Sequence, residues 1–341
     1  MSISIDDLRT HLTTFIAGKV DSPVRITALQ PIPGGASRET WALDIEVESG
    51  ALVGPHALIL RMDQATSMNP EALERSEEFA LLRVAYEAGV KAPRPRWLDG
   101  TGAVLGRPFL LMDRVEGESI GPRVVRRPEF AQAREHLPQQ MAEQLARIHT
   151  IDPMTSELGF LPHPAKGYSP ARHAIDGVRE QLDQIGIQRP ALEFGLRWLE
   201  QHVPQHEEHI LIHGDFRIGN IIIGSDELCA VIDWEFAHIG DPHEDLAWPC
   251  VRDWRFGNDA LRVGGVGDLE TYVVAYEALS GRMVDRTALH YWEVLGNVRW
   301  AATCYIQADR HLSGADPSIE LASLGRRGAE MELEFLTLIG G

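Results

Sequence analysis

The segment that most constrains the fold of this chain lies at residues 209–248. In it, an apolar run ends in a His-Gly-Asp tripeptide whose last residue is Asp215, and Asn220 follows five positions later. Two further apolar runs, separated by a four-residue turn signal, predict a β-hairpin whose second strand ends at Asp233. Because a hairpin returns the chain towards its starting point, we expect the side chains of Asp215, Asn220 and Asp233 to be delivered to one place.

Three oxygen-bearing side chains gathered in this way suit phosphoryl transfer. That reaction needs positioning and neutralisation of charge on the γ-phosphoryl group more than it needs covalent help. Mg²⁺ is a hard cation that takes one or two protein oxygens and completes its shell with phosphate oxygens and water, so Asn220 and Asp233 are candidate metal ligands. Asp215 is the candidate catalytic base, because a carboxylate can orient an acceptor hydroxyl and accept its proton.

The pattern His-Gly-Asp-x4-Asn followed by Ile-Asp-Trp resembles that of the aminoglycoside phosphotransferase family, within the wider group of choline and other small-molecule kinases. More narrowly, it is similar to the branch found beside or fused to acyl-CoA dehydrogenases. The resemblance implies Asp215 as the base and Asn220 and Asp233 as magnesium ligands, with ATP or GTP as co-substrate. It also implies a small-molecule hydroxyl substrate and a functional link to an acyl-CoA dehydrogenase. The acceptor stays open between an aminoglycoside, an amino alcohol, a sugar and a hydroxyacyl compound.

The periodicity of the chain as a whole predicts two lobes. Strand-like runs dominate residues 1–113, and helical periodicity dominates residues 114–341. The expected strands are 24–29, 40–47, 57–62 and 108–112, and the expected helices are 4–18, 70–88, 130–148, 171–184 and 192–202, with several more after 246. This layout predicts an α+β, two-lobed, protein-kinase-like fold, with an antiparallel-sheet nucleotide-binding lobe and a mostly helical lobe that carries the catalytic loop and the acceptor site.

A turn-rich stretch lies between the first two expected strands. It contains Gly34, Gly35 and Ser37. Glycines let backbone N–H groups approach phosphates closely, so these residues are candidates for a flap over the nucleotide; an ordinary hairpin turn is the alternative.

Arg61 ends the third expected strand, at a point where kinases and typical members of the resembling family place a lysine. An arginine keeps the positive charge and can grip phosphate with two parallel donors, although its fork is bulkier. Glu78 on the following helix is the candidate ion-pair partner. Glu74 and Glu77 lie close enough in sequence to be alternatives, and spacing does not decide among the three.

The strand at 108–112 leads into a candidate hinge between the lobes. There the backbone of Asp113 and Val115 is a candidate for hydrogen bonds to a purine ring, and Met112 for an apolar wall. In the catalytic segment, Asp245 and Trp248 are expected to anchor the loop.

Composition excludes several classes of function. The formal net charge of −18 argues against nucleic acid as a partner, because binding a phosphate backbone needs clustered Lys and Arg. No apolar run reaches the roughly 18 residues that a membrane span needs, and the polar, acidic first residues do not look like a targeting signal. The three cysteines match no metal-binding spacing. We therefore expect a cytoplasmic protein; oligomeric state is left open.

Two other functions compete with the kinase interpretation. The first is a metal-dependent hydrolase, whose ligands would come from His213, Asp215, Asp233, His238 and His243. No HxH or HExxH pair is present, and Asn220 has no role in that scheme. The second is a non-catalytic nucleotide-binding module on a kinase fold, for which the arginine at position 61 is the only support.

Overall fold

The computed structural model describes residues 3–32, 38–63, 72–155, 157–205 and 207–340. The chain forms two compact units. Unit 1 comprises Met1–Glu116 together with the two short segments Met154–Phe160 and Ala230–Phe236, and unit 2 comprises the rest.

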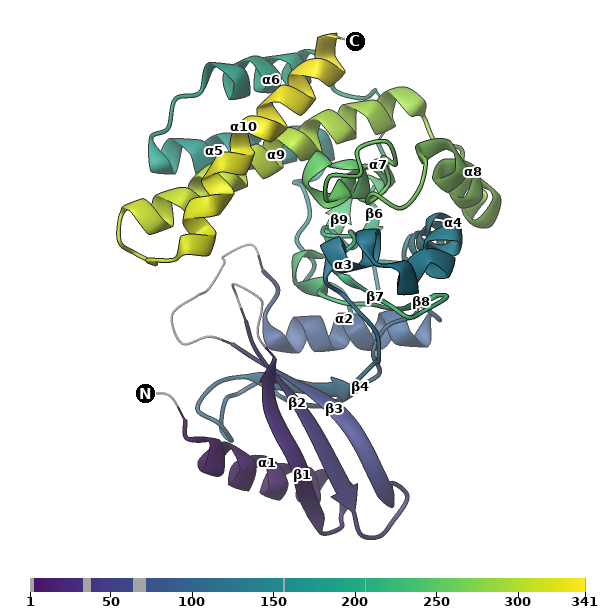
Figure 1. The fold of residues 1–341 in the computed structure, drawn as a ribbon, viewed down its shortest axis with the longest axis vertical. Coiled ribbons are helices and arrows are strands. Elements are labelled where there is room, and N and C mark those ends of the chain that lie inside the picture. The colour runs from purple at the N-terminus through teal and green to yellow at the C-terminus, as the bar shows by residue number, and fades with distance from the viewer. Residues whose placement is uncertain (1–2, 33–37, 64–71, 156, 206, 341) are drawn as a thin grey trace. The chain divides into compact units, whose positions relative to one another are not determined.

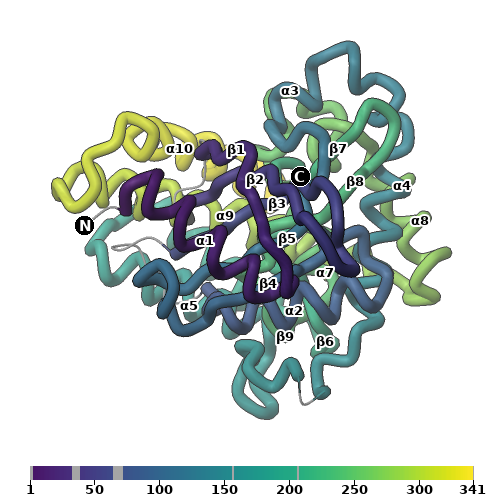
Figure 2. The backbone as a smooth tube through the Cα atoms, turned by 90° about the horizontal axis from the view of Figure 1, so that it is seen from below, coloured from purple at the N-terminus to yellow at the C-terminus, as the bar shows by residue number. Residues whose placement is uncertain are grey.

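Unit 1 is built on a five-stranded antiparallel sheet in the order β1-β2-β3-β5-β4 (Figure 1). The strands are β1 (Val24–Ile32), β2 (Arg38–Val47), β3 (Gly54–Asp63), β4 (Pro95–Asp99) and β5 (Phe109–Asp113). Helix α1 (Ile5–Val20) lies along β1 in two views of the molecule (Figures 1 and 2), and α2 (Arg75–Glu87) packs against β4 and β5.

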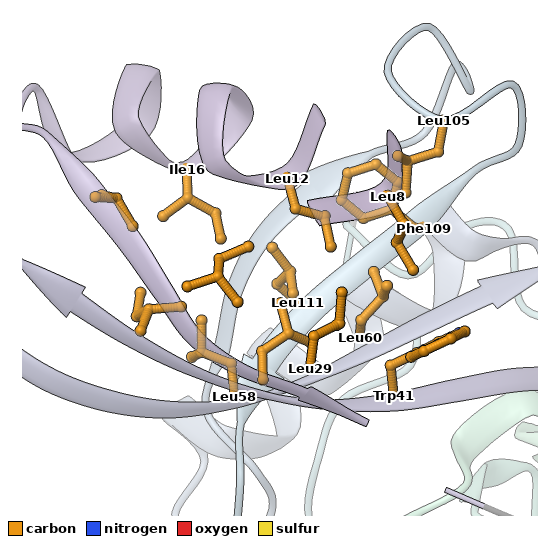
Figure 3. Close-up of a cluster of buried hydrophobic side chains, with 14 of the residues drawn as sticks. Leu8, Leu12, Ile16, Leu29, Trp41, Leu58, Leu60, Leu105, Phe109 and Leu111 are labelled. Carbon is orange, nitrogen blue, oxygen red and sulfur yellow. The ribbon is translucent and has the colours of Figure 1, made fainter. Parts of the chain in front are cut away.

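The core of unit 1 lies between α1 and the sheet. Leu8, Leu12 and Ile16 recur every four residues, so they share one face of α1 and are fully buried (Figure 3). On β3, Leu58, Leu60 and Met62 alternate into the same apolar cluster. Because strand side chains alternate between faces, Arg61 is directed to the opposite face of the sheet.

Helix α1 begins where the sequence placed its start. The side chain of Ser4 accepts the N–H of Asp7 at 3.1 Å, which caps the first turn. The helix continues two residues beyond the predicted end at Gly18 and stops at Asp21, whose φ of 52° is left-handed.

Strand β4 was not predicted, because it begins at Pro95 and a second proline, Pro93, lies two residues earlier. Both prolines signal the end of a regular element rather than the start of a strand. Proline lacks a backbone donor and is tolerated at the first residue of an edge strand. The sheet order places β4 at the edge, where such a residue fits.

Unit 2 is mostly helical. Its helices are α3 (Gly121–Arg126), α4 (Ala131–Ile148), α5 (Pro170–Ile185), α6 (Pro190–Gln201), α7 (Pro242–Ala247), α8 (Leu269–Ser280), α9 (Arg286–Leu312) and α10 (Ile319–Gly340). Helix α9 packs against α5, α6, α7 and α10, and α4 packs against α8 (Figure 1). Short strands β6 (Ile210–Ile212) and β9 (His238–Gly240) pair antiparallel. Strand β7 (Ile221–Ile223) pairs with β8 (Leu228–Val231), which begins in unit 2 and ends in the segment that belongs to unit 1. The predicted hairpin is therefore present, and β9 is an addition to the prediction.

An antiparallel sheet in the N-terminal part and helices in most of the remainder make this an α+β fold, as predicted. None of the described helices combines the length and the apolar character that crossing a bilayer demands.

Candidate active site

The carboxylate of Asp215 is held by three side-chain donors of unit 2. Nε1 of Trp248 donates to Oδ1 at 2.6 Å, and Nε of Arg217 donates to the same oxygen at 3.0 Å. Nδ2 of Asn220 donates to Oδ2 at 2.5 Å. Rotation of the Asp215 side chain would break all three hydrogen bonds, so the carboxylate is fixed in one orientation.

Asn220 faces Asp215 through its amide nitrogen. Nδ2 also donates to the backbone oxygen of Asp215 at 3.0 Å, and two acceptors on one side determine which end of the amide faces them. The amide oxygen Oδ1 consequently receives no hydrogen bond from the part of the chain that the structure describes. An amide oxygen without a donor, on a residue that is otherwise buried, is a suitable ligand for a hard cation.

Asp245 anchors the loop that carries Asp215. Its two carboxylate oxygens accept the backbone N–H groups of His213 at 2.6 Å and of Gly214 at 2.9 Å. Nδ1 of His213 in turn accepts the N–H of Asp215 at 3.3 Å. The side chain of Asp245, on α7, thus positions the main chain immediately before the candidate base, as the sequence suggested.

Asp245 is itself held by a second layer of buried residues. Nε2 of His149 on α4 lies 3.3 Å from Oδ2 of Asp245, and Nδ1 lies 2.7 Å from the hydroxyl of Tyr276 on α8. Burial raises the pKa of Asp245, but the hydrogen bond and charge of His149 and the N–H of His213 outweigh it, so the net pKa lies below the ordinary value. The carboxylate is therefore kept ionised, which is the form that accepts two backbone donors.

Gly219 allows the loop to bring Arg217 close to Asp215. Its φ of 117° is in the region that favours glycine, and a Cβ at this position would lie 2.4 Å from Nη1 of Arg217. A side chain here would displace the guanidinium that holds Asp215.

Unit 1 contains a separate cluster of charged residues around Arg61. Nη1 of Arg61 donates to Oε1 of Glu78 at 3.0 Å, and Nη2 donates to Oδ1 of Asp233 at 2.6 Å. Oε2 of Glu235 lies 3.9 Å from Nη2. Burial lowers the pKa of Arg61, but Glu78, Asp233 and Glu235 together raise it above the ordinary arginine value, so the guanidinium stays charged.

Glu78, rather than Glu74 or Glu77, pairs with Arg61. The side chains of Glu74 and Glu77 instead form a capping box at the start of α2, in which Oε2 of Glu77 accepts the N–H of Glu74 at 2.8 Å. Glu78 also pairs with Arg75, so two arginines share its carboxylate.

Asp233 belongs to unit 1, whereas Asp215 and Asn220 belong to unit 2. Within unit 1, the N–H of Leu73 donates to the backbone oxygen of Glu235 at 2.8 Å, which ties the segment Ala230–Phe236 to the start of α2. Asp233 has a φ of 70°, a left-handed conformation that few residues other than glycine, asparagine and aspartate adopt. Backbone strain of this kind commonly occurs at functional sites.

The candidate hinge residues differ in what their backbones can still bind. Met112 is buried in β5 and pairs with Ile59 of β3. The N–H of Asp113 already donates to the backbone oxygen of Arg94 at 2.9 Å. Among the described residues, no hydrogen bond reaches the N–H or the carbonyl of Val115. The candidate flap residues Gly34, Gly35 and Ser37 lie outside the described residues.

The histidines of the hydrolase alternative have partners of their own. Nε2 of His238 lies 3.4 Å from Glu244, and Nδ1 of His243 lies 2.6 Å from Asp241. His213 serves the loop before Asp215. Within the described ranges, no group of three or more His, Cys, Asp or Glu side chains is arranged to hold a metal ion.

Sequence reasoning missed four residues of these clusters. Arg217, Arg75, His149 and Tyr276 have no motif of their own. The one available signal was the position of Arg217, two residues after the candidate base. His149 and Tyr276 reach the loop only through helices that are distant in sequence.

Comparison with known proteins gives a family. Residues 28–286 match the family described as the phosphotransferase enzyme family. The chain is 30% identical over 196 residues to acyl-CoA dehydrogenase family member 10 of Mus musculus, covering 57% of this chain and 18% of that protein. It is 27% identical over 266 residues to acyl-CoA dehydrogenase family member 11 of Gallus gallus, covering 77% of this chain and 32% of that protein. The chain thus spans about a third or less of the length of these two relatives.

Solved structures share the fold. A protein of Ralstonia eutropha, described as a candidate aminoglycoside phosphotransferase, superposes with a TM-score of 0.72 at 21% identity, covering 96% of this chain and 97% of that one. Spectinomycin phosphotransferase in complex with ADP and spectinomycin gives a TM-score of 0.64 at 15% identity, covering 96% and 98%. The GDP complex of an aminoglycoside 2'-phosphotransferase gives 0.64 at 16% identity, covering 98% and 99%.

These likenesses confirm the predicted protein-kinase-like fold. The family match likewise confirms the resemblance and the predicted enzyme class, because it covers the catalytic loop as well as β2 to α8. The loop pattern, the fold and this match agree: the chain belongs to the phosphotransferase enzyme family.

Proposed function

We propose that this chain is a Mg²⁺-dependent small-molecule kinase, which transfers the γ-phosphate of ATP or GTP to a hydroxyl group. The observation that carries the proposal is the carboxylate of Asp215, which three donors hold in one orientation on an anchored loop. Phosphoryl transfer depends on positioning, and a fixed carboxylate supplies it. The non-catalytic alternative has no comparable explanation for such a carboxylate.

In the proposed reaction, Asp215 orients the acceptor hydroxyl and accepts its proton. The hydroxyl oxygen forms a bond to the γ-phosphorus, the bond from that phosphorus to the β–γ bridging oxygen breaks, and the nucleoside diphosphate leaves with its electron pair. Oδ2 of Asp215 accepts one hydrogen bond and Oδ1 accepts two, so Oδ2 has the greater remaining capacity for the incoming proton.

Asn220 and Asp233 are the proposed magnesium ligands. The residues fit the ion, because the Asn220 amide leaves its oxygen without a donor and Asp233 adds a carboxylate. Bound Mg²⁺ would neutralise charge on the phosphate oxygens. Arg61 is proposed to contact the phosphates, Glu78 to orient Arg61, and the backbone of Val115 to meet the purine beside Met112 and Asp113. Gly34, Gly35 and Ser37 are proposed to cover the nucleotide.

Nucleotide use is supported by relatives solved with ADP or GDP. Two curated relatives are named acyl-CoA dehydrogenases, which supports a functional link between this kinase and such an enzyme. The cytoplasm is the proposed compartment; Cys250 and Cys304 are buried thiols, as expected where thiols stay reduced.

The test is a screen for phosphate transfer from ATP and from GTP, with and without Mg²⁺, across hydroxyl compounds that include aminoglycosides, sugars, amino alcohols and hydroxyacyl compounds. Asp215→Asn should lower kcat on any substrate by about 10²- to 10⁴-fold while nucleotide binding persists. Asp226→Asn makes the same change on an exposed turn of unit 2 and should leave kcat unchanged. Full activity of Asp215→Asn would refute the proposed base.

A further inference from the structure

Unit 2 contains a cavity of about 480 Å³ that no motif in the sequence marked. It lies among α3, residues 252–259 and α10. Its lining residues are Pro122, Arg126, Arg252, Asp253, Phe256, Gly257, Asp259, Arg327 and Glu330. A volume of this size lies within the range that holds small-molecule ligands.

One wall of the cavity forms where α3 packs against Phe256. A Cβ on Gly121 would lie 2.1 Å from the ring of Phe256, so glycine is what lets this ring pack against the start of α3. Nη2 of Arg126, at the other end of α3, donates to the backbone oxygen of Phe256 at 2.7 Å. This bond orients the Arg126 guanidinium beside the cavity.

The charges of the lining are not equally neutralised. Arg252 pairs with Asp259 at 3.1 Å and Arg327 pairs with Asp253, so these two arginines have carboxylate partners. Arg126 forms no ion pair with any described residue; its guanidinium donates instead to the backbone carbonyl of Phe256. The positive charge of Arg126 therefore remains for a ligand.

Two buried donors nearby also lack acceptors. Nε of Arg327 and Nε1 of Trp254 are buried and form no hydrogen bond within the described ranges. Both atoms are closed to solvent, so a ligand in the cavity would reach them only if the surrounding side chains moved. The feature that favours an anion is therefore the charge of Arg126 beside the cavity.

The cavity is connected to the candidate base within unit 2. Trp254 follows Asp253 of the lining, and the guanidinium of Arg217 lies over the Trp254 ring at 4.2 Å. The same Arg217 donates to Asp215 at 3.0 Å. Two side chains thus separate the wall of the cavity from the carboxylate proposed to accept the acceptor's proton.

We propose that this cavity binds an oxyanion, a carboxylate or a phosphate, carried by the acceptor, so that the acceptor is an anionic hydroxyl compound rather than a polycationic aminoglycoside. This inference rests on the proposed kinase function. The net charge of −18 does not oppose it, because charges farther away than a Debye length of about 8 Å are largely screened at physiological salt. The carboxylates of the lining, Asp253, Asp259 and Glu330, all pair with Arg252 or Arg327. The charge of Arg126 therefore decides what the cavity binds.

The test measures binding of matched probes to the full chain without nucleotide, by ligand-observed NMR titration. Glycerate carries a carboxylate, glycerol 3-phosphate a phosphate, glycerol no charge and 3-amino-1,2-propanediol a positive charge on the same three-carbon skeleton. We expect one or both anions to bind at least about tenfold more tightly than glycerol, and the cation no more tightly than glycerol. The stronger of the two anions identifies the source of the oxyanion.

Arg126→Gln should weaken anion binding by about tenfold and leave glycerol unaffected. Arg127→Gln is the matched control: it removes the same charge from the next residue, which pairs with Glu129 and does not line the cavity. Equal affinities for all four probes, or tightest binding of the cation or of kanamycin, would overturn the proposal. Because no turnover is measured, that result leaves the kinase function standing, whereas anion binding without phosphate transfer would count against the kinase function alone.

Discussion

Nη2 of Arg61 lies 2.6 Å from Oδ1 of Asp233, although the two residues are 172 positions apart in sequence. The other arm of the guanidinium holds Glu78 at 3.0 Å. One planar fork can satisfy two carboxylates at once, which the single ammonium of a lysine does less well. The arginine that departs from the kinase pattern therefore has a structural explanation in the two carboxylates beside it.

Removal of this guanidinium should destabilise the protein. Arg61→Ala leaves the buried Glu78 with Arg75 alone and removes the partner of Asp233, so we expect a loss of about 3 kcal/mol in the free energy of unfolding, measured by urea denaturation. Arg61→Lys should lower the free energy of unfolding by less than Arg61→Ala does. The control is Arg83→Ala on the exposed side of α2, expected to cost under about 1 kcal/mol. Equal losses for Arg61→Ala and Arg83→Ala would rule out a stabilising cluster.

Trp248→Phe tests whether the orientation of Asp215 matters for transfer. The change removes the 2.6 Å hydrogen bond from Nε1 and keeps an aromatic ring, so kcat should fall about tenfold while KM for the nucleotide stays the same. Trp292→Phe is matched to it, because Trp292 is equally buried but its Nε1 has no hydrogen-bond partner in the described part of the chain. If both variants lose kcat to the same extent, ring packing rather than the hydrogen bond is responsible.

Asp245→Asn should weaken the loop anchor and alter the acid dependence of stability. At pH 7 we expect a loss of about 3 kcal/mol in the free energy of unfolding, because one acceptor oxygen becomes a donor that faces backbone N–H groups or His149. The folded pKa of Asp245 is depressed below its ordinary value of 3.8, so its contribution is complete above that pH and is lost as the pH falls through the folded value.

The difference in the free energy of unfolding between wild type and Asp245→Asn should therefore stay constant from pH 7 to pH 5 and become smaller below about pH 4. Urea denaturation at several pH values measures this difference, and Asp226→Asn at an exposed position serves as the reference. A difference that does not change with pH would show that Asp245 is not the titrating group.

Leu12→Ala tests the core of unit 1 (Figure 3). Leu12 is fully buried between α1 and the sheet, so the cavity and the lost apolar contact should cost about 2.7–5 kcal/mol. Ile5→Ala on the same helix removes a half-exposed side chain and should cost less than about 1 kcal/mol. Similar values for the two variants would mean that α1 does not stabilise the sheet.

Local patterns in the sequence were sufficient for most of the secondary structure. Strand-like apolar runs predicted β1, β2, β3 and β5, and apolar residues at helical spacing, among them Leu8, Leu12 and Ile16, predicted α1. Strand β4 escaped because Pro95 signals a break locally, whereas its acceptability depends on its edge position. Whether a strand lies at the edge or in the centre depends on how the whole sheet is assembled, which a local sequence pattern does not show.

The sequence by itself determined the candidate base and its loop, because the spacing of His213, Asp215 and Asn220 lies within one short segment whose turns are local. The sequence also suggested Asp245 as the anchor of the loop, but only the tertiary structure decided what holds Asp245. His149 and Tyr276 extend it into one buried chain of hydrogen bonds, and Glu78, rather than Glu74 or Glu77, pairs with Arg61. Such pairings join residues that are far apart in sequence, and burial strengthens them because the local dielectric constant is low.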